Sequence, residues 1–373
     1  MKNRLLISLI LIGIISFGQN SKISFLFIGD VMEHDLQIQS SYLSDGHYNF
    51  TEQFADIQPL IKRADITVAN FEVTLSGKPY KGYPKFSSPD DLAKDMKNSG
   101  IDIFCLANNH INDYGAKGLK RTLEVLDSLN IKRIGAYLNT EDRKKHSPII
   151  IEQNGMKVAL LNYTYGVNEF PIPSPFKVDI IDTNIIKKDL NATQKLGVDG
   201  IIVYFHWGVQ YELLPNETQK NIANICFNNG ANVVIGSHPH VVQPFEYYDF
   251  TMPDKTNKKV LVAYSLGNYV SNYGNWRWCD GGAVLSFTFQ KENGQTTVTC
   301  PKYYLIWVYR KIKKGNLRHY YVMPIVSNKY NKFMTAADKI QLNRFITDYK
   351  EHLKKYNINV PEGENIFQTR KTR

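Results

Sequence analysis

The stretch that decides the fold is VVIGSHPH, residues 233–240. Its first part is apolar and β-branched and stops at Gly236, which is typical of a buried strand. Two histidines with one residue between them follow directly, His238 and His240. Packing explains such a pair poorly, whereas imidazole is the most common nitrogen ligand of transition metals. The stretch therefore predicts a strand that presents metal ligands at its carboxyl end.

Four other apolar runs end in the same way. Candidate ligands follow them: Asp30 after residues 23–28, Glu72 after 66–69, Asn109 after 101–106 and His206 after 201–205. Helix-like segments lie between the strands, at 53–63, 88–100, 116–129, 183–196 and 216–229. This alternation predicts βαβ units, mostly parallel pairing and helices on both faces. Ligands bind beyond the carboxyl ends of such strands, so we expect one metal site at one edge of an α/β sheet.

The 373 residues suffice for one large domain or two ordinary ones, and a hydrophobic content of 43% excludes global disorder. Three segments are expected: 1–18 as a signal peptide, 19–290 as the main α/β domain and 291–373 as a basic C-terminal extension. Within the extension, 297–308 is typical of β-structure and 336–356 predicts a long helix. We expect the extension to pack on the main domain.

The N-terminus has the pattern of an export signal. Lys2 and Arg4 precede an apolar run at 5–17, and small residues precede Gln19. The run is too short for a comfortable membrane span. The expected location is therefore outside the cytoplasm: the periplasm, the cell envelope or the exterior. An uncleaved membrane anchor at this N-terminus is the alternative, and it would be the only membrane contact.

The positive charge of the chain lies at its C-terminal end. The whole chain has a net charge of +10, and residues 309–373 hold fifteen Lys/Arg against five Asp/Glu. Such a segment could contact an anionic surface or polymer, and a solvated basic face is the plainer interpretation. We recognise no nucleic-acid-binding module, no phosphate-binding G-x-x-x-x-G-K-[ST] loop and no G-x-S-x-G nucleophile motif, so no nucleic-acid partner is expected.

The four cysteines show no C-x-x-C spacing. Cys105 and Cys226 lie in apolar segments and are interpreted as small buried hydrophobic residues. Cys279 and Cys300 could form a disulfide in an oxidising compartment, and the sequence leaves this open.

The candidate ligands suit a two-metal hydrolase, which needs donors from separate strands and one shared oxygen ligand. Carboxylate, imidazole and amide donors suit Mn, Zn or Fe. His110 could stabilise charge or protonate a leaving group, and Asp113, three residues later, could orient its imidazole. Each residue also has a structural alternative: a turn for Asp30 and Asp113, a solvated surface for Glu72, a cap for Asn109 and packing for His206.

Six sequence blocks, in this order, resemble the capsule-synthesis CapA family, also called the poly-γ-glutamate biosynthesis protein family. The blocks are GDVM at 29–32, ANFE at 69–72, ANNH at 107–110 with DYG at 113–115, HWG at 206–208, GSHPH at 236–240 and SLGN at 265–268. The resemblance covers about residues 23–273. That family is similar in fold to calcineurin-like metallophosphoesterases, so the resemblance implies a metallophosphatase-like layered α/β sandwich.

The resemblance also implies roles for individual residues. Asp30, Glu72, Asn109, His206, His238 and His240 would hold one or two divalent metal ions, with Glu72 as the shared carboxylate and His110 as the catalytic histidine. Met32 stands where those enzymes have a ligating histidine. The number of metal ions therefore stays open, with His34 as a substitute ligand.

Two functions are compatible with these residues. The first is an exported metal-dependent hydrolase that cleaves a phosphoester or an amide in a capsule polymer, a poly-γ-glutamate-type polymer or its precursor. The second is a non-catalytic envelope protein that binds or tethers an anionic polymer. Other capsule-synthesis proteins are candidate partners in either case.

Overall fold

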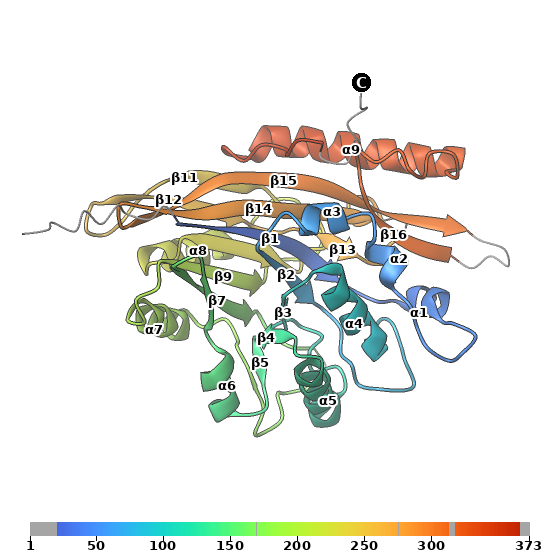
Figure 1. Ribbon diagram of the computed structural model, residues 1–373, viewed down its shortest axis with the longest axis horizontal. Helices are drawn as coiled ribbons and strands as arrows, with labels where there is room; N and C mark the ends of the chain where they lie inside the picture. Colours follow the sequence, from blue (N-terminus) through green and yellow to red (C-terminus); the bar gives the residue numbers. More distant parts are fainter. Residues whose placement is uncertain (1–20, 169, 275, 313–317, 366–373) are drawn as a thin grey trace, which may run out of the picture.

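Two β-sheets pack face to face in the computed structural model, which describes residues 21–168, 170–274, 276–312 and 318–365. One hydrophobic cluster lies between the sheets, and two further clusters join the outer faces to helices. The predicted layered α/β sandwich is confirmed (Figure 1). The expectation of one sheet was wrong: the strands divide between two sheets, and helices cover the outer faces.

The first sheet has the order β16-β15-β14-β1-β2-β3-β4, with β13 beside the end of β1. Its parallel strands are β1 (Ser21–Val31), β2 (Ile66–Phe71), β3 (Ile103–Cys105), β4 (Lys132–Ile134) and β13 (Asn268–Val270). Its antiparallel strands are β14 (Gly281–Glu292), β15 (Gln295–Ile312) and β16 (Arg318–Pro324). The helices of this half are α1 (Asp35–Ser41), α2 (Thr51–Phe54), α3 (Gln58–Ile61), α4 (Asp90–Ser99) and α5 (Gly115–Ser128).

The second sheet has the order β11-β12-β10-β9-β7-β6. Its central strands are parallel: β7 (Met156–Thr164), β9 (Gly200–His206), β10 (Val233–Ser237) and β12 (Asn257–Ala263). Antiparallel strands flank them, β6 (Ile149–Gln153) and β11 (Phe245–Thr251). Its helices are α7 (Thr183–Gln194) and α8 (Glu217–Asn228), and a small ribbon of β5 (Ala136–Tyr137) and β8 (Lys177–Val178) lies near α6 (Thr140–His146).

Strand β1 shows why its sequence is apolar throughout. Phe25 and Phe27 belong to the cluster between the sheets, whereas Leu26 and Ile28 belong to the cluster under the helices. Successive side chains of a strand point to opposite faces, so a strand that is covered on both faces must be apolar at every position. Phe287 of β14 stacks on both phenylalanines, with ring centroids 5.6 and 5.8 Å away.

Three elements show how the local sequence and the packing act together. Residues 53–63 do not form one helix: Pro59 lies in the first turn of α3, where its missing N–H does no harm, and the chain turns between α2 and α3. Strand β14 is the first strand of a hairpin with β15 and lies inside the sheet, between β1 and β15. Helix α8 is capped by Asn216, whose side chain accepts the Gln219 N–H.

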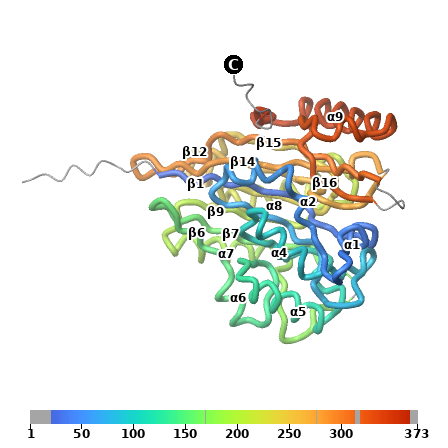
Figure 2. The backbone as a smooth tube through the Cα atoms, turned by 45° about the vertical axis from the view of Figure 1, so that its right-hand side comes forward, coloured from blue at the N-terminus to red at the C-terminus, as the bar shows by residue number. Residues whose placement is uncertain are grey.

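The C-terminal segment is continuous with the rest of the fold. Strand β14 runs through residue 290, and β15 and β16 extend the same sheet. Helix α9 (Ala336–Tyr356) lies along β15, on the opposite side of the molecule from α5 and α6 (Figures 1 and 2). The side chains that α9 buries are Leu342, Phe345, Tyr349, His352 and Leu353.

All four cysteines are free thiols. Cys105, Cys226 and Cys279 are buried, as the sequence predicted for the first two, and Cys300 is exposed. Cys279 and Cys300 therefore form no disulfide in this structure. The predicted signal peptide lies outside the described residues. Among the residues that are described, no helix has both the length and the hydropathy needed to span a membrane.

Replacing Tyr349 by phenylalanine tests how firmly α9 is attached. The fully buried Tyr349 hydroxyl accepts the Val242 N–H at 3.0 Å and donates to the Trp278 carbonyl. Tyr349→Phe leaves both backbone groups without this partner, so we expect the free energy of unfolding to fall by about 1–3 kcal/mol in chemical denaturation. Ile340→Ala, at a position of α9 that is 68% exposed, should change it by less than about 0.5 kcal/mol. Equal midpoints for Tyr349→Phe and the parent protein would contradict this attachment.

Candidate metal centre

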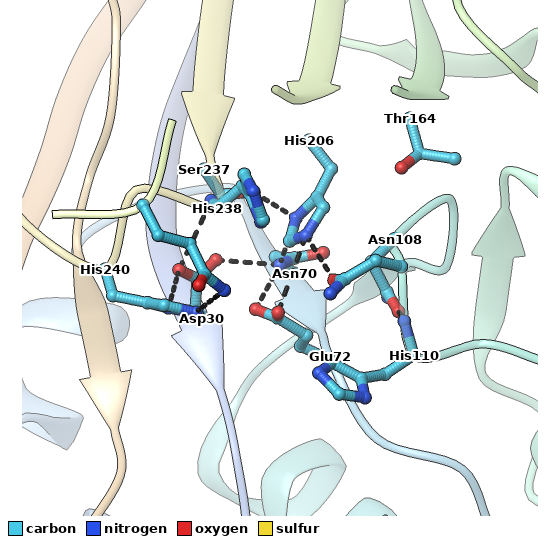
Figure 3. A network of polar contacts seen from close by, with 12 residues as sticks. Asp30, Asn70, Glu72, Asn108, His110, Thr164, His206, Ser237, His238 and His240 are labelled. Atoms are coloured by element: carbon cyan, nitrogen blue, oxygen red, sulfur yellow. Dashed lines mark hydrogen bonds and ion pairs between the residues drawn. The ribbon is translucent and has the colours of Figure 1, made fainter. Parts of the chain in front are cut away.

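The carboxyl ends of strands from both sheets meet at one buried polar centre (Figure 3). Asp30 lies near the end of β1 and Glu72 directly follows β2 in the first sheet. His206 ends β9, and His238 and His240 follow β10 in the second sheet. The side chains of all five residues are at most 4% exposed. The centre therefore lies between two sheets and not at the edge of one.

Close backbone contact directs Asp30 into the centre. A Cβ atom at Gly29 would lie 1.9 Å from the Gly267 carbonyl oxygen, so no larger residue fits. The next amide, Asp30 N–H, donates to that same oxygen at 2.9 Å. The register between β1 and β2 shifts between Ile28 and Asp30, and such an irregularity redirects a side chain.

The turn after β10 holds its two histidines in a backbone conformation that side chains rarely adopt. The φ angles are +96° at His238 and +58° at His240. Non-glycine residues in this region are uncommon and cluster at functional sites. Asp30 Oδ2 accepts the His238 N–H at 3.3 Å and lies 3.0 Å from His240 Nδ1. The first sheet thus fixes the turn of the second.

Two ligand groups share one carboxylate. Asp30, Glu72 and His206 offer donor atoms within 4.8 Å of one another, and so do Glu72, His238 and His240. Glu72 is common to both groups. A shared oxygen ligand between two sets of donors is the arrangement of a two-metal site.

The charge of this centre fits a divalent cation. Asp30 and Glu72 are both fully buried, and among the described residues no lysine or arginine forms an ion pair with either. Glu72 Oε1 makes no hydrogen bond, and neither does His238 Nδ1. Burial, and next the Asp30 carboxylate, raise the pKa of Glu72 well above its usual value. Carboxylate, imidazole and amide donors of this kind would accept Mn, Zn or Fe.

Burial disfavours the charged form of two of the site histidines, His206 and His238. Burial lowers the pKa of His206 well below its ordinary value, and burial with the neighbouring His240 lowers that of His238 to about 3. His240 Nδ1 faces two acceptors, Asp30 Oδ2 at 3.0 Å and Asn268 Oδ1 at 3.1 Å, so it carries the ring proton. Its Nε2 faces the side-chain amide of Gln210 at 3.5 Å and is the atom that would bind a metal.

Asn70 lies at the middle of the network and was not among the predicted site residues. Its side-chain amide donates to Asp30 Oδ1 at 2.8 Å and lies 3.3 Å from Glu72 Oε2 and 3.2 Å from His206 Nδ1. The sequence held a signal for it, because residues two apart on a strand share a face and Asn70 is two before Glu72. Tyr165 was also missed, and its ring lies 4.5 Å from that of His238.

Asn109 and His110 lie beside the ligand groups. Asn109 Oδ1 accepts from His206 Nε2 at 2.7 Å, which places the predicted amide ligand at the centre. His110 Nδ1 is 2.8 Å from Asp113 Oδ2, and that oxygen also accepts the Phe86 N–H at 2.8 Å. The carboxylate therefore orients the imidazole, as the three-residue spacing suggested.

Met32 and His34 do not complete the ligand set. Met32 is buried and lines a pocket next to the centre. His34 lines the same pocket, but its Nδ1 accepts the Asn272 N–H at 3.2 Å and it belongs to neither ligand group. Ser237, the residue before His238, places its hydroxyl 3.1 Å from His206 Nδ1.

Known proteins with similar sequences belong to the family that the six sequence blocks resemble. Residues 24–273 match the family described as bacterial capsule synthesis protein PGA_cap. The capsule biosynthesis protein CapA of Bacillus anthracis is 31% identical over 74% of this chain and 66% of its own length. The PGA biosynthesis protein CapA of Bacillus subtilis is 28% identical over 74% of this chain and 70% of its own length. The chain thus spans about two thirds of each relative, and the predicted CapA resemblance is confirmed.

Solved structures show a distant likeness. The calcineurin-like phosphoesterase YfkN of Bacillus subtilis aligns with 90% of this chain and 99% of its own at 15% identity and a TM-score of 0.44. The NAD nucleotidase of Haemophilus influenzae aligns with 90% of this chain and 61% of its own at 15% identity and a TM-score of 0.47. Because the family match covers most of the described fold and contains every candidate ligand, the chain belongs to the bacterial capsule synthesis protein PGA_cap family.

Proposed function

We propose that this protein is an exported, metal-dependent hydrolase that cleaves a phosphoester in a capsule-type envelope polymer or its precursor. The observation that carries the proposal is the buried Glu72 carboxylate, which is common to two groups of metal-ligand donors. The printed names of the two Bacillus relatives concern capsule and PGA biosynthesis, which supports an envelope polymer as the setting. An amide bond in such a polymer is the second bond type that this centre could hydrolyse.

Each polar residue has a role in this proposal. Asp30, Glu72, Asn109, His206, His238 and His240 would hold one or two Mn, Zn or Fe ions, and Asn70 would orient the Asp30 carboxylate. When bound, such ions activate a water molecule and stabilise charge on the phosphoryl oxygens. The donor atoms of His206, His238 and Glu72 already lie close together, so no rearrangement of the fold is needed for them to bind an ion.

His110 would protonate the leaving oxygen. Its Nδ1 is bound to Asp113, so the opposite ring nitrogen, Nε2, is the one that can give a proton to a substrate. Phe86 packs edge-on against the ring, with centroids 4.7 Å apart. The two neighbours fix the imidazole in one orientation, which general acid catalysis requires.

A non-catalytic, polymer-binding role is the second candidate. One observation favours it: α9 turns four lysines and an arginine outward, Lys339, Arg344, Lys350, Lys354 and Lys355. An exposed cationic helix could attract an anionic polymer. The buried ligand centre favours hydrolysis, because tethering a polymer needs no unpaired carboxylates in a protein interior.

Removal of one imidazole tests the ligand assignment. Elemental analysis of the purified protein should find about one or two equivalents of metal, and His238→Ala should weaken metal binding by about 100-fold or more. The control His47→Ala, at an exposed histidine, should keep the metal. Hydrolysis of bis-p-nitrophenyl phosphate should follow the metal content. Absence of metal under every loading condition would sink the proposal, and bound metal without turnover would favour polymer binding.

Mutation of His110 separates acid catalysis from metal binding. His110→Ala should lower kcat for glycerol 3-phosphate by about 10²–10⁴-fold, because an alkoxide must be protonated to leave. The loss for p-nitrophenyl phosphate should be much smaller, since p-nitrophenolate leaves without a proton. The metal content should not change. Equal losses on both substrates would show that His110 is not the acid.

The titration of His238 tests the electrostatics of the metal-free protein. Burial disfavours the imidazolium, so the pKa of His238 should be about 3. An ordinary histidine, with a pKa of about 6.5, would be mostly protonated near pH 5.5. Nitrogen chemical shifts of the imidazole, followed by NMR after chelation of metal, should therefore report a neutral ring at that pH. A midpoint between about pH 6 and 7 would contradict the buried, neutral ligand.

A further inference from the structure

A pocket of about 280 Å³ adjoins the metal centre. His110 and His240 belong to its lining, so whatever fills it lies against both the proposed acid and a proposed ligand. Tyr83, Tyr211 and Trp276 also line it, and they are 68%, 38% and 55% exposed. Partly exposed aromatic side chains next to a reactive centre are typical of a binding subsite.

Three aromatic rings form one continuous wall of this pocket. The ring of Tyr211 lies 5.0 Å from Trp276 and 6.1 Å from Tyr273, and Tyr273 lies 6.0 Å from Trp276. The wall reaches the metal centre, because the ring of His240 is 5.1 Å from that of Tyr273. Centroid distances of this size mean that the rings touch one another. No flat base or ammonium group fits between them, so a ligand must lie over the wall.

The polar groups of the pocket are side-chain amides, tyrosine hydroxyls and the imidazoles of His34, His110 and His240. Gln210 and Asn272 contribute to the lining, and among the described lining residues there is no lysine, arginine, aspartate or glutamate. A glutamate polymer carries a carboxylate on every residue, and its recognition would call for cationic side chains. Neutral amides beside aromatic faces suit a ligand with hydroxyl groups and an apolar ring face.

We propose that this pocket binds a sugar ring, so that the substrate is a glycosyl phosphoester and not a glutamate chain. The inference rests on the proposed hydrolase function and adds its substrate class. The ring lies over Trp276 and Tyr211, Gln210 and Asn272 bond its hydroxyls, and its phosphoryl group reaches the ligands of the metal centre.

The position of His110 matches this orientation. In hydrolysis, the oxygen of a water molecule bonds to phosphorus, the bond from phosphorus to the sugar oxygen breaks, and that oxygen keeps the electron pair and takes up a proton. The products are the free sugar hydroxyl and inorganic phosphate or a phosphomonoester. Since His110 lines the sugar pocket, its imidazole lies on the side of the departing oxygen.

A binding measurement tests the pocket without the reaction. Metal-free protein is titrated with methyl α-glucoside and with adenosine, both uncharged, and binding is followed by saturation-transfer NMR. The glucoside should bind more tightly, and Trp276→Ala should weaken it about 5- to 10-fold, the range of one aromatic contact. The matched control is Tyr42→Ala, since Tyr42 is also 55% exposed but lines a different cavity. Tighter binding of adenosine would contradict the sugar and indicate a nucleoside ligand. Equal effects of Trp276→Ala and Tyr42→Ala would show that the pocket is not the binding site.

A kinetic measurement on the metal-loaded protein completes the test. The value of kcat/KM should be at least about 10-fold higher for glucose 1-phosphate than for glycerol 3-phosphate, which has the same charge but no ring. Trp276→Ala should remove this preference, whereas Tyr42→Ala, which lines a different cavity, should keep it. Inhibition by tri-γ-glutamate stronger than by methyl α-glucoside would overturn the proposal. Loss of all hydrolysis with intact glucoside binding would instead refute the hydrolase function and keep the sugar subsite.

Discussion

The structure depends on two buried carboxylates that face each other between two sheets. Asp30 and Glu72 come from the first sheet, and the second sheet places histidines opposite them instead of lysines or arginines. Buried negative charge without a counter-charge is costly. The Asn70 amide and the His238 N–H relieve part of that cost, and a divalent cation would relieve the rest. The same surroundings that raise the pKa of Glu72 in the metal-free protein would therefore favour binding of a cation.

The surrounding fold keeps this polar centre rigid. The turn that carries His238 and His240 is bound to Asp30 on one side and, through Val242, to Tyr349 of α9 on the other. A helix near the end of the chain thus supports ligands that lie a hundred residues earlier. Helix α9 packs against β15 of the first sheet, so this support belongs to the same sheet as Asp30.

The pocket and the metal centre divide the chemistry between them. The centre concentrates carboxylates and imidazoles, whereas the adjoining pocket offers aromatic faces and uncharged amides. The charged phosphoryl group would react at the metal centre, and the neutral sugar ring would be recognised in the pocket. Helix α9 is joined to the segment that carries the aromatic wall, since Asp348 of α9 pairs with Arg277, the neighbour of Trp276, at 2.8 Å.

The sequence by itself determined the alternation of strands and helices, the ends of α5, α7 and α8, and most of the residues at the centre, because apolar runs and the polar residues that stop them are local features. Tertiary structure decided the rest. A βα repeat is the same whether its strands form one sheet or two, so only packing shows that Asp30 and His206 come from opposite sheets. The role of Asn70 and the aromatic wall of Tyr211, Tyr273 and Trp276 depend on contacts between segments far apart in the chain, which no local pattern records.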